Sequence, residues 1–456
     1  MSTPPEPGWC AALPLLAWRA ATTAAAPLMP LWLTRRARRG KEDPARLRER
    51  RGEGADRPAG PLLWLHGASV GESQSALPLI EALAATRPAL HFLVTTGTVT
   101  AARLLEERLP PSLAARVQHR FAPLDVPGHV ARFLDGWRPD AAVFIESEIW
   151  PNLILAAAAR GVPMALVNAR VSARSAKGWG RMPGMARRLF GAFRLVIAQT
   201  ELDAARLRAL GAESARAWGN LKFAARPLPA PEPALAALRR AIGARPVLLA
   251  ASTHPGEEAQ IAEAHGLLRA RLPDLLTIVA PRHPERGPAL ARELASLLAA
   301  DEGPPPLVLR SGGALPTPGT AIYVADTLGE LGLLYRVAGA ALIGGSLIPH
   351  GGQNPLEAAR LGCPILLGPH TANFTAIADR LLGAGAALRV ADSAALAEAA
   401  ALVLTDPLRA RSMTSAAARI AADAGALPER MAVAIETLLP AFSLSPSGTG
   451  AAAGPG

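Results

Sequence analysis

The sequence predicts an α/β protein with two doubly wound domains, preceded by a membrane-anchoring segment at the N-terminus. Its 456 residues exceed what one core usually organises, and an apolar fraction of 50% can fill two. Short apolar runs alternate with helical stretches in two series, which is typical of parallel sheets covered by helices on both faces. A proline-rich segment between the two series predicts the domain boundary.

The N-terminal segment over residues 10–31 is mostly apolar, is bracketed by Trp9 and Trp32, and is followed by a cluster of arginines. As a helix it would extend roughly 33 Å, about the thickness of a bilayer's hydrocarbon core. We expect a spanning or deeply embedded anchor, which with its basic flank takes up residues 1–45. An arginine and prolines inside the segment keep a surface-lying amphipathic helix as the alternative. A cleaved signal peptide is disfavoured because the basic cluster follows the apolar region instead of preceding it. Basic residues after an apolar segment favour the cytoplasmic side, so we expect the rest of the chain to be cytoplasmic.

The first series of strands predicts a domain over residues 46–225. It opens with "PLLWLHGASVGESQSALPLIEAL", which is typical of a buried strand, a glycine turn and a helix. The segment "RPLPAPEPA", residues 226–234, predicts an exposed and fairly stiff linker. A second series, from "PVLLAAS" to "PILLGP", predicts a domain over residues 235–440, and we expect a cleft between the two domains. The end of the chain, residues 441–456, has the composition of a disordered tail.

Charge and cysteine content restrict the classes of function. Two distant cysteines exclude a disulfide framework and a cysteine-rich zinc site. The net charge of +11 is compatible with nucleic acid, but aromatic residues are 4% and no basic helix or stacking platform is present, so we expect no nucleic-acid partner. An anionic membrane surface or phosphorylated substrates explain the charge equally well. Lysine is rare in this arginine-rich chain, so a lysine such as Lys222 is a candidate for a role that needs a compact ammonium.

Acidic residues after two predicted strands are candidates for catalysis, because ligands of such sheets bind at the carboxyl ends of the strands. Glu72 begins a helix after a glycine turn, where the positive end of the helix favours an ionised carboxylate that can accept a proton. Its alternative role is to cap that helix. Glu146 and Glu148 follow the strand "AAVFI" and are candidates for proton transfer, metal binding or capping. No spacing of His or Asp completes a metal site nearby, so metal binding is disfavoured.

Basic and glycine-rich segments predict an anion site. Lys222 in "GNLKF" joins the basic stretch "NARVSARSAKG", a group able to receive a phosphate or carboxylate, with solvated surface charge as the alternative. In the second domain, Arg282 follows a strand and offers a two-pronged donor to phosphate oxygens. In "GGSLIPHGGQNPLEAA" the glycines permit close approach of a ligand, and a helix beginning at Asn354 and Pro355 favours an anion. Glu357 lies within reach of ribose hydroxyls, and the missing GxGxxG favours a mononucleotide over a dinucleotide.

These motifs together resemble a known family. "GASVGE", "IESEIWPNL", "NARVSARSAKG", "GNLKF", "STHPGEE", "PRHPER", "DTLGEL", "GGSLIPHGGQNPLEAA" and "GPHTANF" occur in the order found in the bacterial 3-deoxy-D-manno-oct-2-ulosonic acid (Kdo) transferases. The resemblance covers residues 14–430 and implies a GT-B fold of two Rossmann-like domains, an N-terminal membrane anchor and no metal or other cofactor. It also implies transfer of Kdo from CMP-Kdo to the lipid A precursor, lipid IVA, with inversion at the anomeric carbon. The implied location is the cytoplasmic face of the inner membrane, where the enzyme contacts membrane lipids.

The resemblance further implies roles for particular residues. Glu72 corresponds to the general base, and Glu146 and Lys222 correspond to groups that stabilise the transition state. The implied CMP contacts are Pro281, Arg282, Leu328, Gly329, Glu330, Asn354, Pro355, Leu356 and Glu357. Gln353 departs from the family pattern, which usually has histidine there, so a role that needs a titrating imidazole does not carry over to this position.

Two other functions fit the same architecture. One is another GT-B nucleotide-sugar enzyme, such as a UDP-sugar transferase or an epimerase, which titration with CMP against UDP separates from a Kdo transferase. The other is a non-catalytic lipid-binding protein at the membrane. Such a protein has no use for Glu72 as a base, and an assay of CMP release in the presence of the lipid A precursor distinguishes it.

Overall fold

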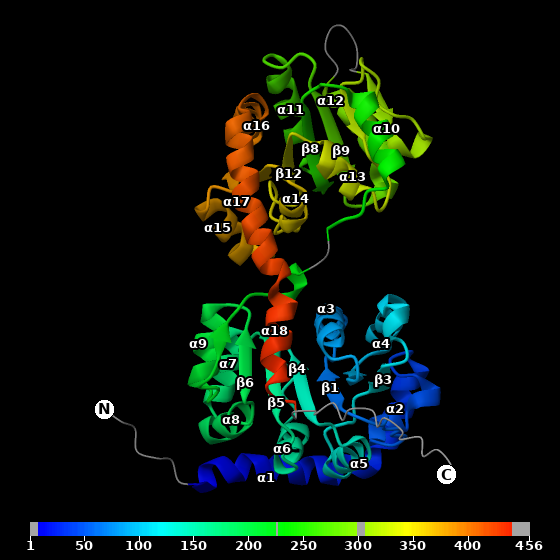
Figure 1. Ribbon diagram of the computed structural model, residues 1–456, viewed down its shortest axis with the longest axis vertical. Helices are drawn as coiled ribbons and strands as arrows, with labels where there is room; N and C mark the ends of the chain where they lie inside the picture. The colour runs from blue at the N-terminus through cyan, green and yellow to red at the C-terminus, as the bar shows by residue number, and fades with distance from the viewer. Residues whose placement is uncertain (1–7, 225–226, 299–305, 440–456) are drawn as a thin grey trace, which may run out of the picture. The chain divides into compact units, whose positions relative to one another are not determined.

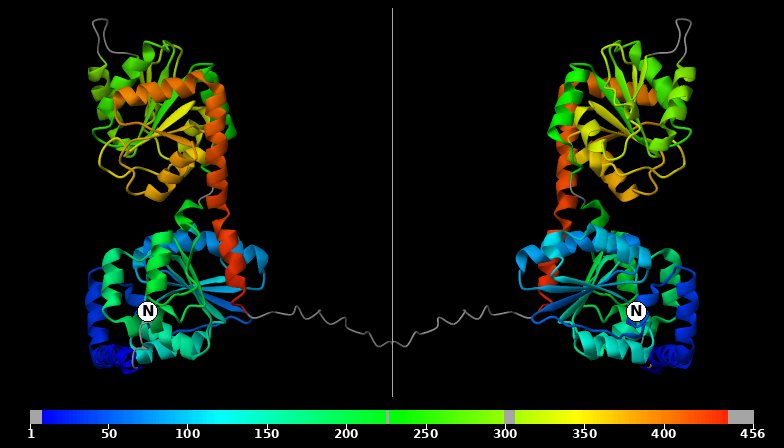
Figure 2. Two further views of the ribbon diagram at one scale, coloured as in Figure 1. Left: turned by 90° about the vertical axis from the view of Figure 1, so that its left-hand side faces the viewer. Right: turned by 90° about the vertical axis from the view of Figure 1, so that its right-hand side faces the viewer.

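The computed structural model describes residues 8–224, 227–298 and 306–439 (Figure 1). These residues divide into two compact units: residues 8–224 with 426–439, and residues 227–298 with 306–425. In each unit a parallel sheet is covered by helices on both faces, as Figures 1 and 2 show. The predicted pair of doubly wound α/β domains is therefore confirmed. The predicted tail, residues 441–456, lies outside the described residues.

The sheet of the first unit has seven parallel strands in the order β3-β2-β1-β4-β5-β6-β7. The strands are β1 Leu62–His66, β2 His91–Thr96, β3 Val117–Phe121, β4 Ala141–Ile145, β5 Met164–Ala169, β6 Leu195–Ala198 and β7 Arg216–Ala217. The chain winds outwards from β1 in one direction and from β4 in the other. The loops after β1 and β4 therefore flank the point where the strand order reverses, which is where such sheets bind ligands.

Side chains alternate between the two faces of this sheet and form two cores. Leu62 and Trp64 face helices α5, α6, α8 and α9, whereas Leu63 and Leu65 face α3, α4 and α18. The helices of the unit are α1 Gly8–Ala25, α2 Met29–Arg38, α3 Val70–Thr86, α4 Val99–Arg108, α5 Pro127–Trp137, α6 Pro151–Ala159, α7 Ala173–Gly180, α8 Pro183–Phe190, α9 Glu201–Ala209 and α18 Leu427–Glu436. Short 3-10 helices add η1 Ala26–Leu28, η2 Pro44–Arg46, η3 Glu49–Arg51, η4 Pro111–Leu113 and η5 Leu221–Phe223.

The second domain ends earlier than predicted. Residues 426–439, which include α18, belong to the first unit, whereas the sequence predicts a second domain that extends to residue 440. Its apolar side chains Leu427, Met431 and Ile435 are buried in the core beside α3. The spacing of these side chains predicts an amphipathic helix but carries no information about which sheet the helix covers.

The predicted apolar segment at the N-terminus is divided between α1, η1 and α2. Helix α1 packs along α5, α6 and α8. The ring nitrogen of Trp18 donates to Asp125 (2.7 Å), and the Asn152 amide donates to Thr22 Oγ1 (3.0 Å). Among the described residues, no helix is both long enough and apolar enough to cross a membrane.

The second unit contains another sheet of seven parallel strands, in the order β10-β11-β9-β8-β12-β13-β14. The strands are β8 Val247–Thr253, β9 Leu276–Pro281, β10 Leu307–Leu309, β11 Ile322–Val324, β12 Ala340–Ile343, β13 Ile365–Leu367 and β14 Ala387–Arg389. The helices are α10 Glu232–Ile242, α11 Glu258–Arg269, α12 Gly287–Leu297, α13 Leu331–Val337, α14 Leu356–Arg360, α15 Thr375–Gly383, α16 Ser393–Thr405 and α17 Pro407–Gly425, with η6 Pro284–Arg286 and η7 Arg310–Gly312. Here the strand order reverses between β8 and β12.

Part of the predicted linker, residues 226–234, is folded onto the second unit. Arg336 of α13 donates to the carbonyl oxygen of Leu228 (2.8 Å), and α10 already begins at Glu232. A Cβ atom at Gly332 would lie 2.0 Å from the carbonyl oxygen of Pro229, so only glycine allows this contact. The described prolines of the segment are exposed, as the sequence predicts, but the segment also contacts α13 through Leu228 and Pro229.

Candidate functional site

Glu72 lies where the strand order of the first sheet reverses, in the first turn of α3 after β1. Its carboxylate Oε2 accepts from the backbone N–H groups of Ala68 (2.6 Å) and Ser69 (3.2 Å), while Ser69 Oγ accepts from the Glu72 N–H. This reciprocal arrangement is a capping box, so Glu72 has the structural role that the sequence leaves open as its alternative. The side chain's second oxygen, Oε1, accepts neither of these bonds.

The environment of Glu72 raises the pKa of its carboxyl group. Burial is the main cause, the negative charge of Glu148 adds to it, and the hydrogen bonds from Ser69 and Ala68 oppose it. The N–H groups at the helix start favour the ionised carboxylate, as the sequence predicts, but desolvation outweighs their effect on the pKa. A raised pKa brings the carboxylate closer to the basicity that proton transfer near neutral pH requires.

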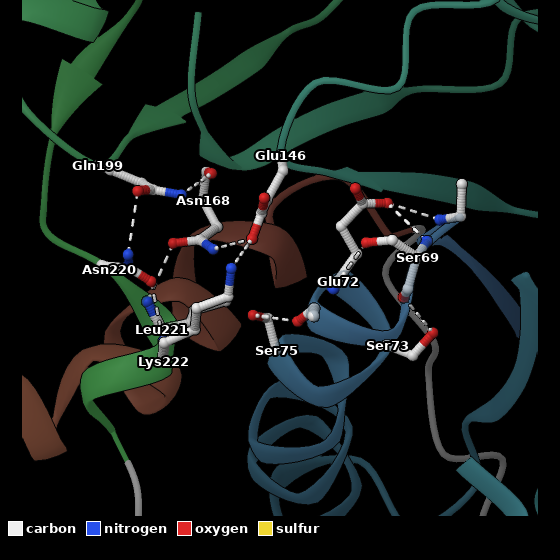
Figure 3. A network of polar contacts seen from close by, with 12 residues as sticks. Ser69, Glu72, Ser73, Ser75, Glu146, Asn168, Gln199, Asn220, Leu221 and Lys222 are labelled. Carbon is white, nitrogen blue, oxygen red and sulfur yellow. Dashed lines mark hydrogen bonds and ion pairs between the residues drawn. The ribbon is translucent and has the colours of Figure 1, made fainter. Parts of the chain in front are cut away.

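Glu146 and Lys222 form an ion pair beside this turn (Figure 3). Lys222 Nζ lies 2.8 Å from Glu146 Oε1, with 15% of the Glu146 side chain and 43% of the Lys222 side chain exposed. A Cβ atom built on Gly71 would lie 3.3 Å from Lys222 Nζ, so the ammonium lies directly over the first turn of α3. The structure thus brings the three predicted catalytic residues to one place in the first unit.

A network of buried and half-buried amides holds this pair in position (Figure 3). Asn168 on β5 is fully buried, accepts from the Leu221 N–H (3.0 Å) and lies 3.4 Å from Glu146 Oε1 through its amide nitrogen. Gln199, after β6, donates to the Asn168 carbonyl oxygen (3.0 Å) and accepts from Asn220 (3.0 Å). Asn220 in turn caps η5 by accepting from the Lys222 N–H (3.0 Å).

Two members of the cluster have backbone conformations that L-residues rarely adopt. Glu146 has φ 65° and Asn168 has φ 52°, both in the left-handed region. Such strain persists where surrounding contacts determine the conformation, and it is concentrated at functional sites. The other predicted carboxylate of this loop, Glu148, instead accepts from the indole nitrogen of Trp150 (2.7 Å), and burial raises its pKa.

The second unit has a cavity of about 190 Å³ at the carboxyl ends of its strands. Of the predicted CMP contacts it brings together Pro281, Arg282, Leu328, Gly329, Asn354 and Glu357. Further lining residues are Ser252, Thr327, Leu331, Leu334, Tyr335 and Gln353, with Ala280, Pro284 and Ala325. Burial raises the pKa of Glu357, and the positive charge of Arg360, a hydrogen bond with Asn354 and the charge of Arg282 oppose the shift.

Glu330, Pro355 and Leu356, which the sequence also predicts as contacts, are not among the residues that line this cavity. The Glu330 carboxylate instead accepts hydrogen bonds from the Arg310 guanidinium, at 2.8 and 3.0 Å, and from the Thr327 hydroxyl. Leu356 is fully buried in the core of the unit. The helix expected to favour an anion, α14, has five residues, and Asn354 Oδ1 already accepts from the Leu356 N–H (3.1 Å).

Glu257 ties together two loops that border the cavity. Its fully buried carboxylate accepts from the N–H groups of His254 (3.0 Å), Gly345 (2.6 Å) and Leu347 (3.0 Å). The loop after β8 is thereby fixed to the glycine-rich loop after β12. The motif "STHPGEE" is the sequence signal for this residue, although two of its partners lie about 90 residues away in the chain.

No group of three or more His, Cys, Asp or Glu side chains suited to a metal ion occurs in residues 8–224, 227–298 and 306–439. The predicted absence of metal and cofactor remains a prediction about the reaction.

Comparisons with known proteins identify the family. The family model for 3-deoxy-D-manno-octulosonic-acid transferase (kdotransferase) matches residues 45–225. The 3-deoxy-D-manno-octulosonic acid transferase of Bordetella pertussis is 39% identical over 406 residues, 86% of this chain and 92% of that protein. The C-terminal CMP-Kdo binding domain of WaaA from Acinetobacter baumannii is 32% identical, with a TM-score of 0.38, over 41% of this chain and 95% of that one.

A more distant structure shares the fold alone. The UDP-GlcNAc 2-epimerase from Neisseria meningitidis bound to UDP-GlcNAc is 13% identical, with a TM-score of 0.52, over 83% of this chain and 100% of that one. The identity to the Bordetella pertussis protein extends over nearly the full length of both chains. This protein is therefore a glycosyltransferase and belongs to the 3-deoxy-D-manno-octulosonic acid (Kdo) transferase family.

Proposed function

We propose that the protein transfers Kdo from CMP-Kdo to the lipid A precursor, lipid IVA, in lipopolysaccharide biosynthesis. The observation that carries this proposal is the cavity of the second unit, where Arg282, Asn354 and Glu357 meet in a member of the Kdo transferase family. A guanidinium suits a phosphate, and a carboxylate suits ribose hydroxyls. This combination fits a nucleoside monophosphate such as the CMP part of the donor.

In the proposed reaction, Glu72 takes the proton from an acceptor hydroxyl, whose oxygen then attacks the anomeric carbon of Kdo while the CMP phosphate leaves. A single displacement inverts the configuration at that carbon. Lys222, held by Glu146, supplies a fixed positive charge in the first unit, and Arg282 supplies one to the phosphate in the second. Each step uses this chain's own side chains, and we propose that no metal or cofactor takes part.

Purified protein is expected to release CMP from CMP-Kdo only when the lipid A precursor is present, and mass spectrometry should find the Kdo on the lipid. Titration should show binding of CMP and much weaker binding of UDP. CMP release that does not depend on the lipid would argue against this acceptor, and preferential binding of UDP would favour a UDP-sugar enzyme.

The nucleotide site gives a first prediction for mutagenesis. Glu357→Ala should weaken CMP binding by roughly 1 to 3 kcal/mol, because ribose hydroxyls lose a half-buried acceptor. The exposed Glu285→Ala, outside the cavity lining, is the matched control and should bind CMP normally. Isothermal titration measures both. Unchanged CMP affinity in a folded Glu357→Ala protein would leave Glu357 with a structural role.

We further propose that the N-terminal helices hold the enzyme to the cytoplasmic face of the inner membrane, among its lipids. Large apolar side chains of this segment are exposed, and they include Leu13, Leu16, Leu28, Leu31 and Trp32. The arginines in the last turn of α2 suit the phosphates of anionic lipids. These features favour helices that lie in the interface.

Exchanging Leu28 and Leu31 for serine should therefore reduce flotation of the protein with vesicles that contain anionic phospholipid. The pair is more than 60% exposed, so folding should be little affected, which a melting curve checks. Full flotation of the double variant would mean that other residues attach the protein.

A further inference from the structure

Three histidines gather at the carboxyl ends of adjacent strands in the second unit. His254 follows β8, His283 follows β9 and His350 lies in the loop after β12. The rings of His254 and His350 are stacked, with centroids 3.8 Å apart and planes at 28°. The His283 ring meets His254 edge-on at 6.3 Å. We call His254, His283 and His350 the imidazole cluster.

The imidazole cluster adjoins the nucleotide cavity. Gln353 lines the cavity, and its Nε2 lies 2.9 Å from Nε2 of His254. Arg282, which also lines the cavity, directly precedes His283 in the chain. A group attached to a phosphate near Arg282 and Gln353 would therefore have the imidazole cluster as a neighbour.

The charges around the cluster favour an anion. The pKa of His254 is lowered by burial first, and then by the positive charges of His350, His283 and Arg282, with a small opposing effect of Glu258. The two buried carboxylates nearby already have partners: Glu257 accepts three backbone N–H groups, and Glu258 pairs with Arg286 (2.9 Å). Glu285 lies 3.7 Å from His283, and both side chains are more than half exposed, so solvent screens that charge.

The geometry of the cluster does not suit a metal ion. Stacked imidazoles carry their nitrogens on the edges of two separate rings, and no group of three or more side chains suited to a metal ion is found here among the described residues. The same arrangement suits a planar anion at the ring edges, where N–H groups act as donors. Glu257 and the glycine at position 345 hold the arrangement, since a Cβ atom on Gly345 would lie 3.3 Å from both the His254 and the His350 ring.

We infer that the imidazole cluster binds the carboxylate of the donor sugar, and that Gln353 is a positioning residue that orients His254 for this contact. The inference rests on the proposed function, in which the donor is CMP linked to a sugar acid. CMP-Kdo differs from CMP by carrying this second anion. The cluster therefore distinguishes a CMP-linked acidic sugar from the free nucleotide, whereas Arg282 and Glu357 bind the part that the two share.

The test measures the binding of CMP and of CMP-Kdo, without acceptor, to the full-length protein and its variants. His350→Phe keeps a ring that can stack on His254 but has no N–H, and His350→Ala removes the ring as well. His350 is exposed, so both variants should fold. We expect both to weaken CMP-Kdo binding on the order of 10-fold, the scale of a lost charge-assisted hydrogen bond, with CMP affinity changed less than about 2-fold.

Three results would overturn the inference. One is an equal loss of affinity for CMP and CMP-Kdo, which would place the cluster on the phosphate. Another is normal CMP-Kdo affinity in His350→Phe together with weakened affinity in His350→Ala, which would mean that His350 acts only by stacking on His254. The third is unchanged CMP-Kdo binding in both variants. Failure of the proposed function looks different, since the unaltered protein would then not bind CMP-Kdo at all.

Discussion

Glu72→Gln is expected to lower turnover by on the order of 10²-fold or more while leaving CMP affinity nearly unchanged. The amide keeps the size of the side chain and an oxygen that can still accept from the N–H groups of Ala68 and Ser69. It cannot take a proton from the acceptor. Steady-state kinetics with the lipid A precursor and titration with CMP measure the two effects separately.

Ser69→Ala is the matched control, because it removes the other half of the capping box and leaves the carboxylate in place. It should lower stability by about 1 kcal/mol without a comparable loss of turnover. The pH profile adds a second check: kcat/KM of the unaltered enzyme should fall as pH drops through the raised pKa of Glu72, and this limb should be absent from Glu72→Gln. Near-normal turnover of Glu72→Gln would mean that Glu72 only caps α3. An equal loss of turnover in Ser69→Ala would mean the same.

Lys222→Met should lower turnover by about 10²- to 10³-fold, the scale found when one group that stabilises developing charge is removed. Its ammonium lies 2.8 Å from Glu146 and is fixed through Asn220 and Asn168, so it is placed without reorganisation during the reaction. Glu146→Gln combined with Lys222→Met measures the coupling of the pair, and a double mutant no worse than Lys222→Met would show that they act as one unit.

Two milder variants separate the position of this charge from its presence. Lys222→Arg keeps the charge but puts a broader guanidinium where a compact ammonium lies between Gly71 and Glu146, so turnover should fall while the melting temperature stays close to normal. Gly71→Ala leaves Lys222 itself unchanged but places a methyl group 3.3 Å from its Nζ. Gly178→Ala, in a helix with open space around the glycine, is its control. Full activity of both Lys222→Arg and Gly71→Ala would show that placement of the charge is unimportant.

The sequence predicts much of this site because its strands are continuous apolar runs and the residues that end them are polar. Glu72, Glu146 and Arg282 could each be found by that pattern alone. The pairing of Glu146 with Lys222 could not, because it depends on the order of strands in the sheet and on the chain's return through η5. Asn168 and Gln199 also end buried runs, but an amide in that place has no signature of its own.

Lengths and tertiary partners of helices are the parts that the sequence predicts poorly. The pattern predicts that a helix begins at Asn354 and Pro355, but it does not predict that α14 ends after five residues, before Gly362, which has φ 68°. The apolar face of α18 is equally suited to either sheet until the core beside α3 is known. Burial of Glu257 likewise follows from N–H groups contributed by a distant loop.

The return of α18 to the first unit makes the second unit an insertion within the first unit's chain, entered at residue 225 and left at residue 425. A gene encoding residues 225–425 therefore specifies one uninterrupted module, which recombination could exchange between enzymes without altering the host sheet. The host unit has no such independence. A chain truncated before Leu427 would lack the side chains that fill the core beside α3, so a separable first unit requires its two segments to be fused directly across the removed module.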